Sequence, residues 1–225
     1  MKIKTVINKI LRPLGIEVSR PRPQLIQPWN TDRDFLPLMN MIQPRTLVDR
    51  ERCYVLYQAC LHVRGLAGDA AEIGVYKGGT ARLLATMLSG RKVDLFDTFS
   101  GMPSVDPAKD LHREGDFSST SLEDVKVFLN GCSNVRLFPG IFPGTAEPVR
   151  TSSYALVHVD VDIYRSVLDG CSFFYPRLIK GGVMIFDDYG FLTCPGALQA
   201  VDEFFADKPE RPCYLPTGQC VVHKI

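Results

Sequence analysis

The chain has 225 residues, of which 45% are hydrophobic and 23% charged, and its formal net charge is +1. These values are typical of one globular domain with a sizeable core. The nearly neutral charge gives no reason to expect a nucleic-acid partner, and no apolar run reaches the roughly 20 residues that span a bilayer. The seven cysteines form no CxxC pair, so we expect reduced thiols in a cytoplasmic protein rather than disulfides or a zinc site.

Residues 1–33 are predicted to precede a single domain at 34–225. The first part places apolar residues on one helical stripe and basic residues around it, which predicts a basic amphipathic helix ended by Pro13 and Gly15. The prolines between 20 and 30 predict a linker. The helix either docks on the domain or a second subunit, or lies on an anionic membrane, which would place the protein at the periphery of the inner membrane. No signal peptide is expected.

From residue 34 onward, helical patterns alternate with short apolar strands. The predicted strands are DAAEIGV, KVDLFDTF, NVRLFPG, YALVHVD and GGVMIFDD, and the tail CYLPTGQCVVHKI predicts a hairpin. Helices are predicted at 50–63, from Gly79 or Thr80, after the capping-box pattern Ser121 and Asp124, after Ser166 and after Pro195. We therefore predict an α/β, Rossmann-like fold with a mostly parallel seven-stranded sheet and an antiparallel C-terminal hairpin.

The turn after the first strand reads EIGVYKGG, from Glu72 to Gly79. Its glycines let the backbone approach a ligand, but the spacing is not GxGxxG, so a pyrophosphate is a poor fit. Glu72 would repel a phosphate and would suit an amino group. Asp97, at the end of the second strand, can accept hydrogen bonds from both hydroxyls of a ribose. This set favours S-adenosylmethionine over NAD, and the alternative is a plain tight turn with a solvated Asp97.

Acidic residues follow two further strands, in His158-Val159-Asp160-Val161-Asp162 and Phe186-Asp187-Asp188. Because parallel strands end at one edge of the sheet, these carboxylates are expected to crowd there and to need a cation, for which Mg²⁺ is the hard ion that oxygen ligands favour. Asp160 is also the candidate base for an acceptor hydroxyl. In the alternative interpretation, Asp162 and Asp188 cap the following helices. His158 points to the opposite face from Val159 and is expected to be a buried histidine.

Several blocks resemble the macrocin O-methyltransferase family, the TylF/MycF-like enzymes that modify antibiotic sugars. They are AEIGVYKGGTARLL, LFDTFSGMP, GDFSSTSLEDV, HVDVDIYRS, YPRLIKGGVMIFDDYG and CPGALQAVDEFF. The resemblance implies a class I methyltransferase fold, S-adenosylmethionine, Mg²⁺, a sugar hydroxyl as acceptor, and a homodimer or larger oligomer. Arg165 stands where antibiotic-modifying members carry glutamate, so a glycosylated metabolite or a surface glycan is as plausible an acceptor as a macrolide.

The resemblance also implies roles for individual residues. Those matched to the cofactor motifs are Glu72, Gly74, Tyr76 and Gly78 in the first turn, Asp97 at the ribose, and Asp116 with Phe117 in the cofactor or lid region. Those matched to the metal are Asp160, Asp187 and Asp188, and Asp160 is matched to the general base.

Two segments, 100–120 and 46–52, are candidates to fold over the site and exclude water. His112, Arg113 and Arg50 are either acceptor contacts or solvated charges, and Tyr164 and Tyr189 either stack on a ligand or belong to the core. Cys194 is expected at a helix start rather than as a nucleophile. Two other functions compete with methyl transfer: a Rossmann-type oxidoreductase, and a non-catalytic S-adenosylmethionine-binding scaffold of a glycan-assembly complex.

Overall fold

The structure, a computed structural model, describes residues 26–225, so the predicted N-terminal helix lies outside the described residues. Residues 26–32 hold the short 3-10 helix η2 (Pro28–Asn30) within the predicted linker, and residues 33–225 form one compact unit. In the described part of the chain, no helix is both long enough and apolar enough to cross a membrane.

A seven-stranded sheet runs through this unit in the order β3–β2–β1–β4–β5–β7–β6. Strands β1 to β5 are parallel, β7 is antiparallel to β5, and β6 is antiparallel to β7. The strands are β1 (Asp69–Ile73), β2 (Val93–Asp97), β3 (Val135–Pro139), β4 (Tyr154–Val159), β5 (Leu178–Phe186), β6 (Cys213–Tyr214) and β7 (Cys220–His223). The predicted fold class and the terminal hairpin are confirmed.

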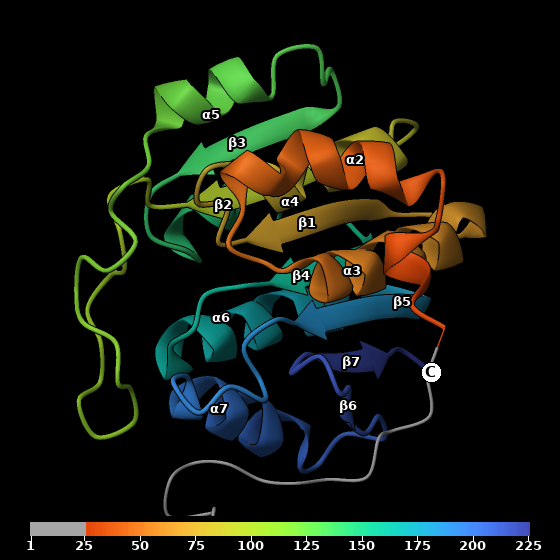
Figure 1. Cartoon of the computed structure of the whole chain (residues 1–225). Helices are drawn as coiled ribbons and strands as arrows, with labels where there is room; N and C mark the ends of the chain where they lie inside the picture. Colours follow the sequence, from red (N-terminus) through yellow and green to blue (C-terminus); the bar gives the residue numbers. More distant parts are fainter. Residues whose placement is uncertain (1–25) are drawn as a thin grey trace, which may run out of the picture. The chain divides into compact units, whose positions relative to one another are not determined.

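Helices cover both faces of the sheet (Figure 1). They are α2 (Phe35–Ile42), α3 (Arg50–His62), α4 (Gly79–Met87), α5 (Leu122–Phe128), α6 (Tyr164–Phe174) and α7 (Pro195–Phe205). Helices α2, α3 and α4 pack together, and α6 packs on α7. The β1–α4–β2 and β4–α6–β5 crossovers run in opposite directions along the sheet, so right-handed connections put the two groups on opposite faces.

The strand register brings the predicted site residues to one level. Ile73 pairs with Phe96 of β2 and with Val159 of β4, and Val159 pairs with Phe186 of β5. The residues that end or follow these strands therefore leave the sheet side by side at its carboxyl edge. In Figure 1 the arrowheads of β1 to β5 point to this edge.

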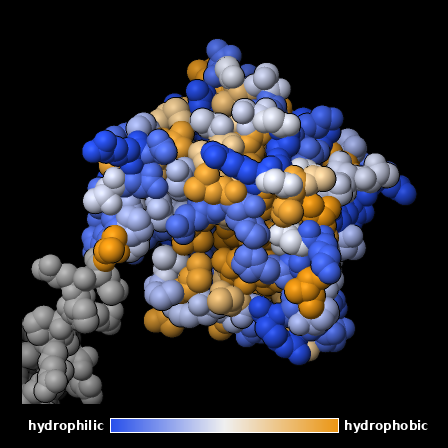
Figure 2. Space-filling model, turned by 90° about the vertical axis from the view of Figure 1, so that its right-hand side faces the viewer, coloured by the Kyte–Doolittle hydropathy of each residue, from blue (hydrophilic) through white to orange (hydrophobic). Residues whose placement is uncertain are grey.

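The opposite end of the sheet presents the amino ends of the parallel strands. Figure 2 views this side, where apolar side chains gather near the centre of the face among hydrophilic ones. The residues that carry chemistry in the sequence analysis belong to the carboxyl edge instead.

Most strands are one or two residues shorter than predicted at their ends, and two element starts differ by three residues. Strand β5 begins at Leu178, before the predicted glycine pair, because Leu178 already pairs with Tyr154 ahead of a register shift. Helix α6 begins at Tyr164 rather than after Ser166, and the Asp110 carboxylate accepts the Tyr164 N–H at 2.8 Å. The predicted cap of α5 is confirmed, since the Ser121 hydroxyl accepts the Asp124 N–H at 3.1 Å.

Candidate active site

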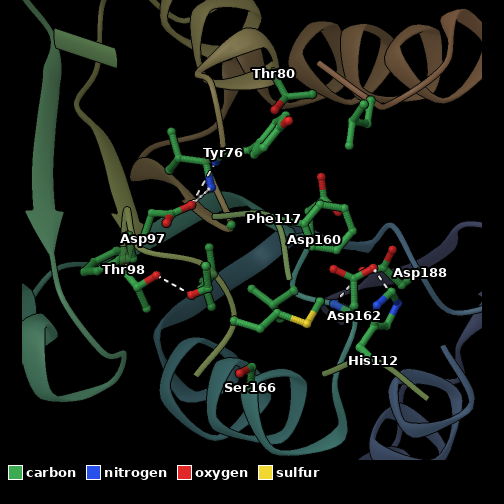
Figure 3. A pocket seen from close by; sticks show the side chains of 18 of the residues that line it. Tyr76, Thr80, Asp97, Thr98, His112, Phe117, Asp160, Asp162, Ser166 and Asp188 are labelled. Carbon is green, nitrogen blue, oxygen red and sulfur yellow. Dashed lines mark hydrogen bonds and ion pairs between the residues drawn. The ribbon is translucent and has the colours of Figure 1, made fainter. Parts of the chain in front are cut away.

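A cavity of about 310 Å³ opens at the carboxyl ends of the parallel strands. Its walls come from the turns after β1, β2, β4 and β5 and from the two predicted lid segments (Figure 3). The lining residues include Arg52, Gly74, Val75, Tyr76, Asp97, Met102, His112, Phe117, Asp160, Asp162, Asp188 and Cys194. One space therefore joins the predicted cofactor turn to the predicted carboxylate cluster.

The turn after β1 is closed by Asp97. Its Oδ2 accepts the N–H groups of Val75 at 2.7 Å and Tyr76 at 2.8 Å, and its Oδ1 accepts the Phe99 N–H at 2.6 Å. A carboxylate offers about four acceptor positions, so three of them are used by the backbone. The remaining acceptor position is open to a further donor, and the contact of Asp97 with a ribose stays a prediction.

Only glycine fits at position 74, because the backbone of Asp160 packs directly against it. Its φ is +87°, and a Cβ at this position would lie 1.7 Å from the backbone oxygen of Asp160. The same approach is visible in the hydrogen bond from the Asp160 N–H to the Ile73 oxygen at 2.9 Å. The glycine therefore lets β1 and β4 end in contact, which joins the two sides of the cavity.

The carboxylates of Asp160, Asp187 and Asp188 converge, with one oxygen from each within 4.8 Å of the others. Burial, followed by repulsion from Asp187, raises the pKa of Asp160 well above its usual value. Burial and the charges of Asp162 and Asp160 raise the pKa of Asp188. Among the described residues, no hydrogen bond or ion pair to the Asp160 side chain is found, whereas the Asp188 Oδ2 accepts the Asp162 N–H at 2.9 Å.

Asp187 is held differently from its two neighbours. Its carboxylate forms an ion pair with Arg52 and accepts a hydrogen bond from Gln219 at 2.8 Å. Burial alone would raise the pKa of Asp187, but the charges of His158 and Arg52 outweigh this effect and lower it. Asp187 therefore stays ionised beside two carboxylates that resist ionisation.

Behind the cavity, a buried ionic chain connects β1, β4 and β5. The His158 Nδ1 lies 2.8 Å from Glu72 Oε1, and both side chains are fully buried. The His158 Nε2 lies 3.6 Å from Asp187 Oδ1. Burial lowers the pKa of His158, but the two flanking carboxylates outweigh it and raise the pKa well above its usual value. His158 is thus a buried histidine, as its position on an alternating strand predicts, and it does not line the cavity.

Both predicted lid segments contribute to the walls. Residues 45–48 and Arg52 line one part, and Met102, His112 and Phe117 of the long segment after β2 line another. The Asp110 carboxylate fastens this segment to the start of α6 through the Tyr164 N–H. The segment is consequently anchored at its middle.

The sequence profile of the macrocin O-methyltransferase (TylF) family matches residues 41–211 of the chain. The chain belongs to this family.

Individual relatives of known name agree with this membership. The chain is 31% identical over 150 residues to the 8-demethyl-8-(2,3-dimethoxy-alpha-L-rhamnosyl)-tetracenomycin-C 4'-O-methyltransferase of Streptomyces olivaceus, a match covering 60% of this chain and 58% of that protein. It is 32% identical over 155 residues to the demethyldecarbamoylnovobiocin O-methyltransferase of Streptomyces niveus, covering 62% and 58%. Each match thus spans 58% of the relative's length.

The fold of the chain is similar to that of solved methyltransferases. The O-methyltransferase NovP superposes with a TM-score of 0.70 at 27% identity, covering 80% of this chain and 82% of that one. The calicheamicin methyltransferase CalS11 superposes with a TM-score of 0.68 at 17% identity, covering 92% and 99%, which bears on the fold alone.

The residues matched to this family's cofactor motifs divide into two groups. Gly74, Tyr76, Asp97 and Phe117 line the cavity, whereas Glu72, Gly78 and Asp116 do not. The Glu72 carboxylate faces His158 instead. Gly78 is the N-cap of α4, and Asp116 accepts the Arg113 N–H at 2.9 Å.

Among the residues matched to the family's metal site, Asp160 and Asp188 line the cavity and Asp187 lies behind them. The alternative role of Asp162 and Asp188 as helix caps is wrong. No side chain caps α6 or α7 through their N-cap residues Ile163 and Cys194. Cys194 is at a helix start, as predicted.

Several side chains whose role the sequence did not decide interact with residues outside the cavity. The hydroxyls of Tyr164 and Tyr189 donate to Glu203 and Asp202, and neither ring lines the cavity. The Arg165 side chain is 72% exposed and pairs with Asp169 at 2.9 Å, so its charge says nothing about the acceptor. Two residues with clear roles escaped the sequence analysis, Arg52 as the partner of Asp187 and Asp110 as the anchor of the long segment. No local motif marks either, because their partners are distant in the chain.

Proposed function

We propose that the protein transfers a methyl group from S-adenosylmethionine to a hydroxyl of a sugar or glycosylated metabolite, with Mg²⁺ bound at the acceptor. One observation carries this proposal. A single cavity is bounded on one side by the Gly74 turn with Asp97 and on the other by the carboxylates of Asp160 and Asp188, with the carboxylate of Asp187 behind them. A methyl donor and an acidic cation site would then be neighbours.

The cofactor side of the cavity suits a cationic donor better than a phosphate. In dinucleotide-binding folds, free backbone N–H groups at this turn receive the pyrophosphate. Here the Val75 and Tyr76 N–H groups already donate to Asp97, and a carboxylate at that position repels an anion. This arrangement argues against the oxidoreductase alternative. We expect Asp97 to receive one ribose hydroxyl and Phe117 and Tyr76 to contact the donor.

The carboxylate side fits a divalent cation. Three oxygen donors lie within 4.8 Å of one another, and the Asp160 carboxylate has no partner among the described residues. Burial and the neighbouring carboxylates raise the pKa values of Asp160 and Asp188, and a bound cation would favour the charged form of both. Asp160, Asp188 and the ion-paired Asp187 would hold Mg²⁺, which when bound would lower the pKa of an acceptor hydroxyl.

Asp160 would take the acceptor's proton. Its carboxylate lines the cavity and has no partner among the described residues, so it is free to accept a proton from a bound hydroxyl. Arg52 and His158 lower the pKa of Asp187 and so keep a negative charge beside this base. Met102 and the segment around it would exclude water from the reacting hydroxyl. The name of the Streptomyces olivaceus relative, a 4'-O-methyltransferase of a rhamnosyl compound, supports a deoxysugar acceptor.

The test has two steps. Calorimetry is expected to show saturable binding of S-adenosylmethionine and of S-adenosylhomocysteine, and no comparable binding of NADH. Mass spectrometry of reactions with a panel of rhamnosides is then expected to show a mass gain of one methylene group, lost in EDTA and restored by Mg²⁺. Tighter binding of NADH would overturn the proposal in favour of an oxidoreductase. Turnover that persists in EDTA would overturn its metal part.

A further inference from the structure

Three side chains of different metal-binding chemistry meet at the cavity wall beside the carboxylate cluster. His112 comes from the long segment after β2, Asp162 from the connection between β4 and α6, and Cys194 from the start of α7. Figure 3 shows His112 and Asp162 facing one another next to Asp188. All three residues line the cavity.

Their donor atoms form a nearly equilateral triangle. The Cys194 Sγ lies 3.6 Å from His112 Nε2 and 3.5 Å from Asp162 Oδ1, and the His112 Nε2 lies 3.6 Å from that same oxygen. In a tetrahedral zinc site, bonds of about 2.3 Å to sulfur and about 2.0–2.2 Å to nitrogen and oxygen separate the donors by roughly 3.4–3.6 Å. The triangle therefore has the size that a tetrahedral ion requires.

Two of the three residues are also held in position by their neighbours. The second nitrogen of His112, Nδ1, lies 3.3 Å from Asp116 Oδ2, the carboxylate–histidine arrangement that commonly orients a metal-bound imidazole. Asp116 is fixed in turn by the Arg113 N–H at 2.9 Å. Asp162 has a φ of +57°, rare for a residue with a side chain, and its N–H donates to Asp188.

Hydrogen bonds of the Cys194 Sγ account for two sides of this triangle, but no hydrogen bond accounts for the third side, between His112 and Asp162. A separation of 3.6 Å between the histidine nitrogen and the carboxylate oxygen is too long for a good hydrogen bond, yet all three sides of the triangle are equal within 0.1 Å. The buried cysteine is 4% exposed and faces an acid and a histidine rather than apolar side chains only.

We propose that His112, Asp162 and Cys194 bind a zinc-like transition-metal ion, whose fourth position is left to water or to an oxygen of the acceptor. The site is chemically separate from the three-aspartate cluster, because sulfur and imidazole ligands select zinc whereas oxygen-only ligands select magnesium. It is a site that the scattered cysteines of the sequence did not suggest. The ion would join the long segment after β2 to the β4–α6 and β5–α7 connections, and so hold that segment closed over the cavity.

Cobalt(II) is a suitable probe, because a cobalt–thiolate bond gives a charge-transfer absorption band in the near ultraviolet. The full chain, reduced and kept in excess Mg²⁺ to fill the aspartate cluster, is titrated with Co²⁺. We expect the band to saturate at one equivalent, with the visible absorption of a tetrahedral ion, and to disappear when Zn²⁺ is added. Cys194→Ser is expected to abolish the band, whereas Cys213→Ser, which changes an exposed cysteine, is expected to retain it.

Two further variants test whether the metal binds at this site and not at another histidine. His62→Gln tests adventitious binding at the His62 and His223 pair, whose rings lie 5.5 Å apart, and is expected to leave the titration unchanged. Asp116→Asn is expected to keep the band and to weaken Zn²⁺ binding about 10- to 100-fold. If Cys194→Ser does not fold, as judged by circular dichroism, His112→Gln takes its place and is expected to lose the tetrahedral signal. No band in the unmodified chain, or a band that survives Cys194→Ser, would overturn the proposal.

Discussion

Two aspartates at the same edge of the sheet show how differently one residue type can be used. Asp97 ends β2 and Asp160 follows β4, with β1 between them. The Asp97 carboxylate accepts three backbone N–H groups and closes the turns around it. The Asp160 carboxylate has no partner in the described part of the chain, and burial with the nearby Asp187 raises its pKa.

Position at a strand end therefore does not decide what a carboxylate does. The number of N–H groups aimed at it decides, because hydrogen bonds to the charged form stabilise that form. Asp97 stabilises the turns around it, and its carboxylate can still accept a further hydrogen bond from a ligand. The charged form of Asp160 is destabilised by burial and by neighbouring carboxylates, and a bound cation or a proton would remove this cost. Stability and activity should therefore respond in opposite ways to changes at the two positions.

The largest effect is expected from Asp160→Asn. If Asp160 is the base, turnover should fall by about 10²- to 10⁴-fold. A carboxyl whose pKa is raised in the folded state is destabilising when ionised at neutral pH, so the amide should leave the free energy of unfolding unchanged or higher. Methylated product is measured by mass spectrometry and stability by urea unfolding at pH 7.

The matched control for this variant is Asp207→Asn. Asp207 is exposed, with 78% of its side chain accessible, and it does not line the cavity. Both turnover and stability should stay as in the parent protein, within about 0.5 kcal/mol for unfolding. A loss of stability at Asp160 without a loss of turnover would reverse the roles assigned to the two aspartates.

Much of this arrangement was accessible from the sequence. The alternation of apolar strands and helices predicted the sheet, and the acids after HV and IF predicted a carboxylate cluster at its carboxyl edge. The register Val159 to Phe186 explains why that inference worked, since parallel strands that end level with one another must place their following residues together.

Contacts between distant segments were not accessible in this way. The ion pair of Arg52 with Asp187 and the anchoring of the long segment by Asp110 depend on how loops fold back. Glu72 was expected at a ligand because it adjoins a glycine turn, but strand alternation turns its side chain to the face that carries His158. Sequence patterns thus located the edge of the sheet correctly, and only the structure could separate lining residues from those behind them.

Gly74→Ala should destabilise the protein strongly. Gly74 begins the turn that Asp97 binds, and it also packs against the backbone of Asp160. The new Cβ would lie 1.7 Å from the Asp160 oxygen, and a φ of +87° is unfavourable for alanine. We expect the free energy of unfolding to fall by about 3 kcal/mol or more. Urea unfolding provides the measurement, and Gly90→Ala, where a Cβ would meet nothing within 4 Å, is the control with a change below about 1 kcal/mol.

Asp97→Asn is expected to lower turnover less than Asp160→Asn does. Its main effect should be on the stability of the fold. The amide oxygen can still accept two N–H groups, but the amide nitrogen would face a third donor, so unfolding should become easier by about 1–3 kcal/mol. Binding of S-adenosylmethionine, followed by calorimetry, should weaken because the turn that carries Val75 and Tyr76 loses its brace. If Asp97→Asn instead keeps full stability while Asp160→Asn loses it, the hydrogen-bond inventory would not explain which aspartate maintains the fold.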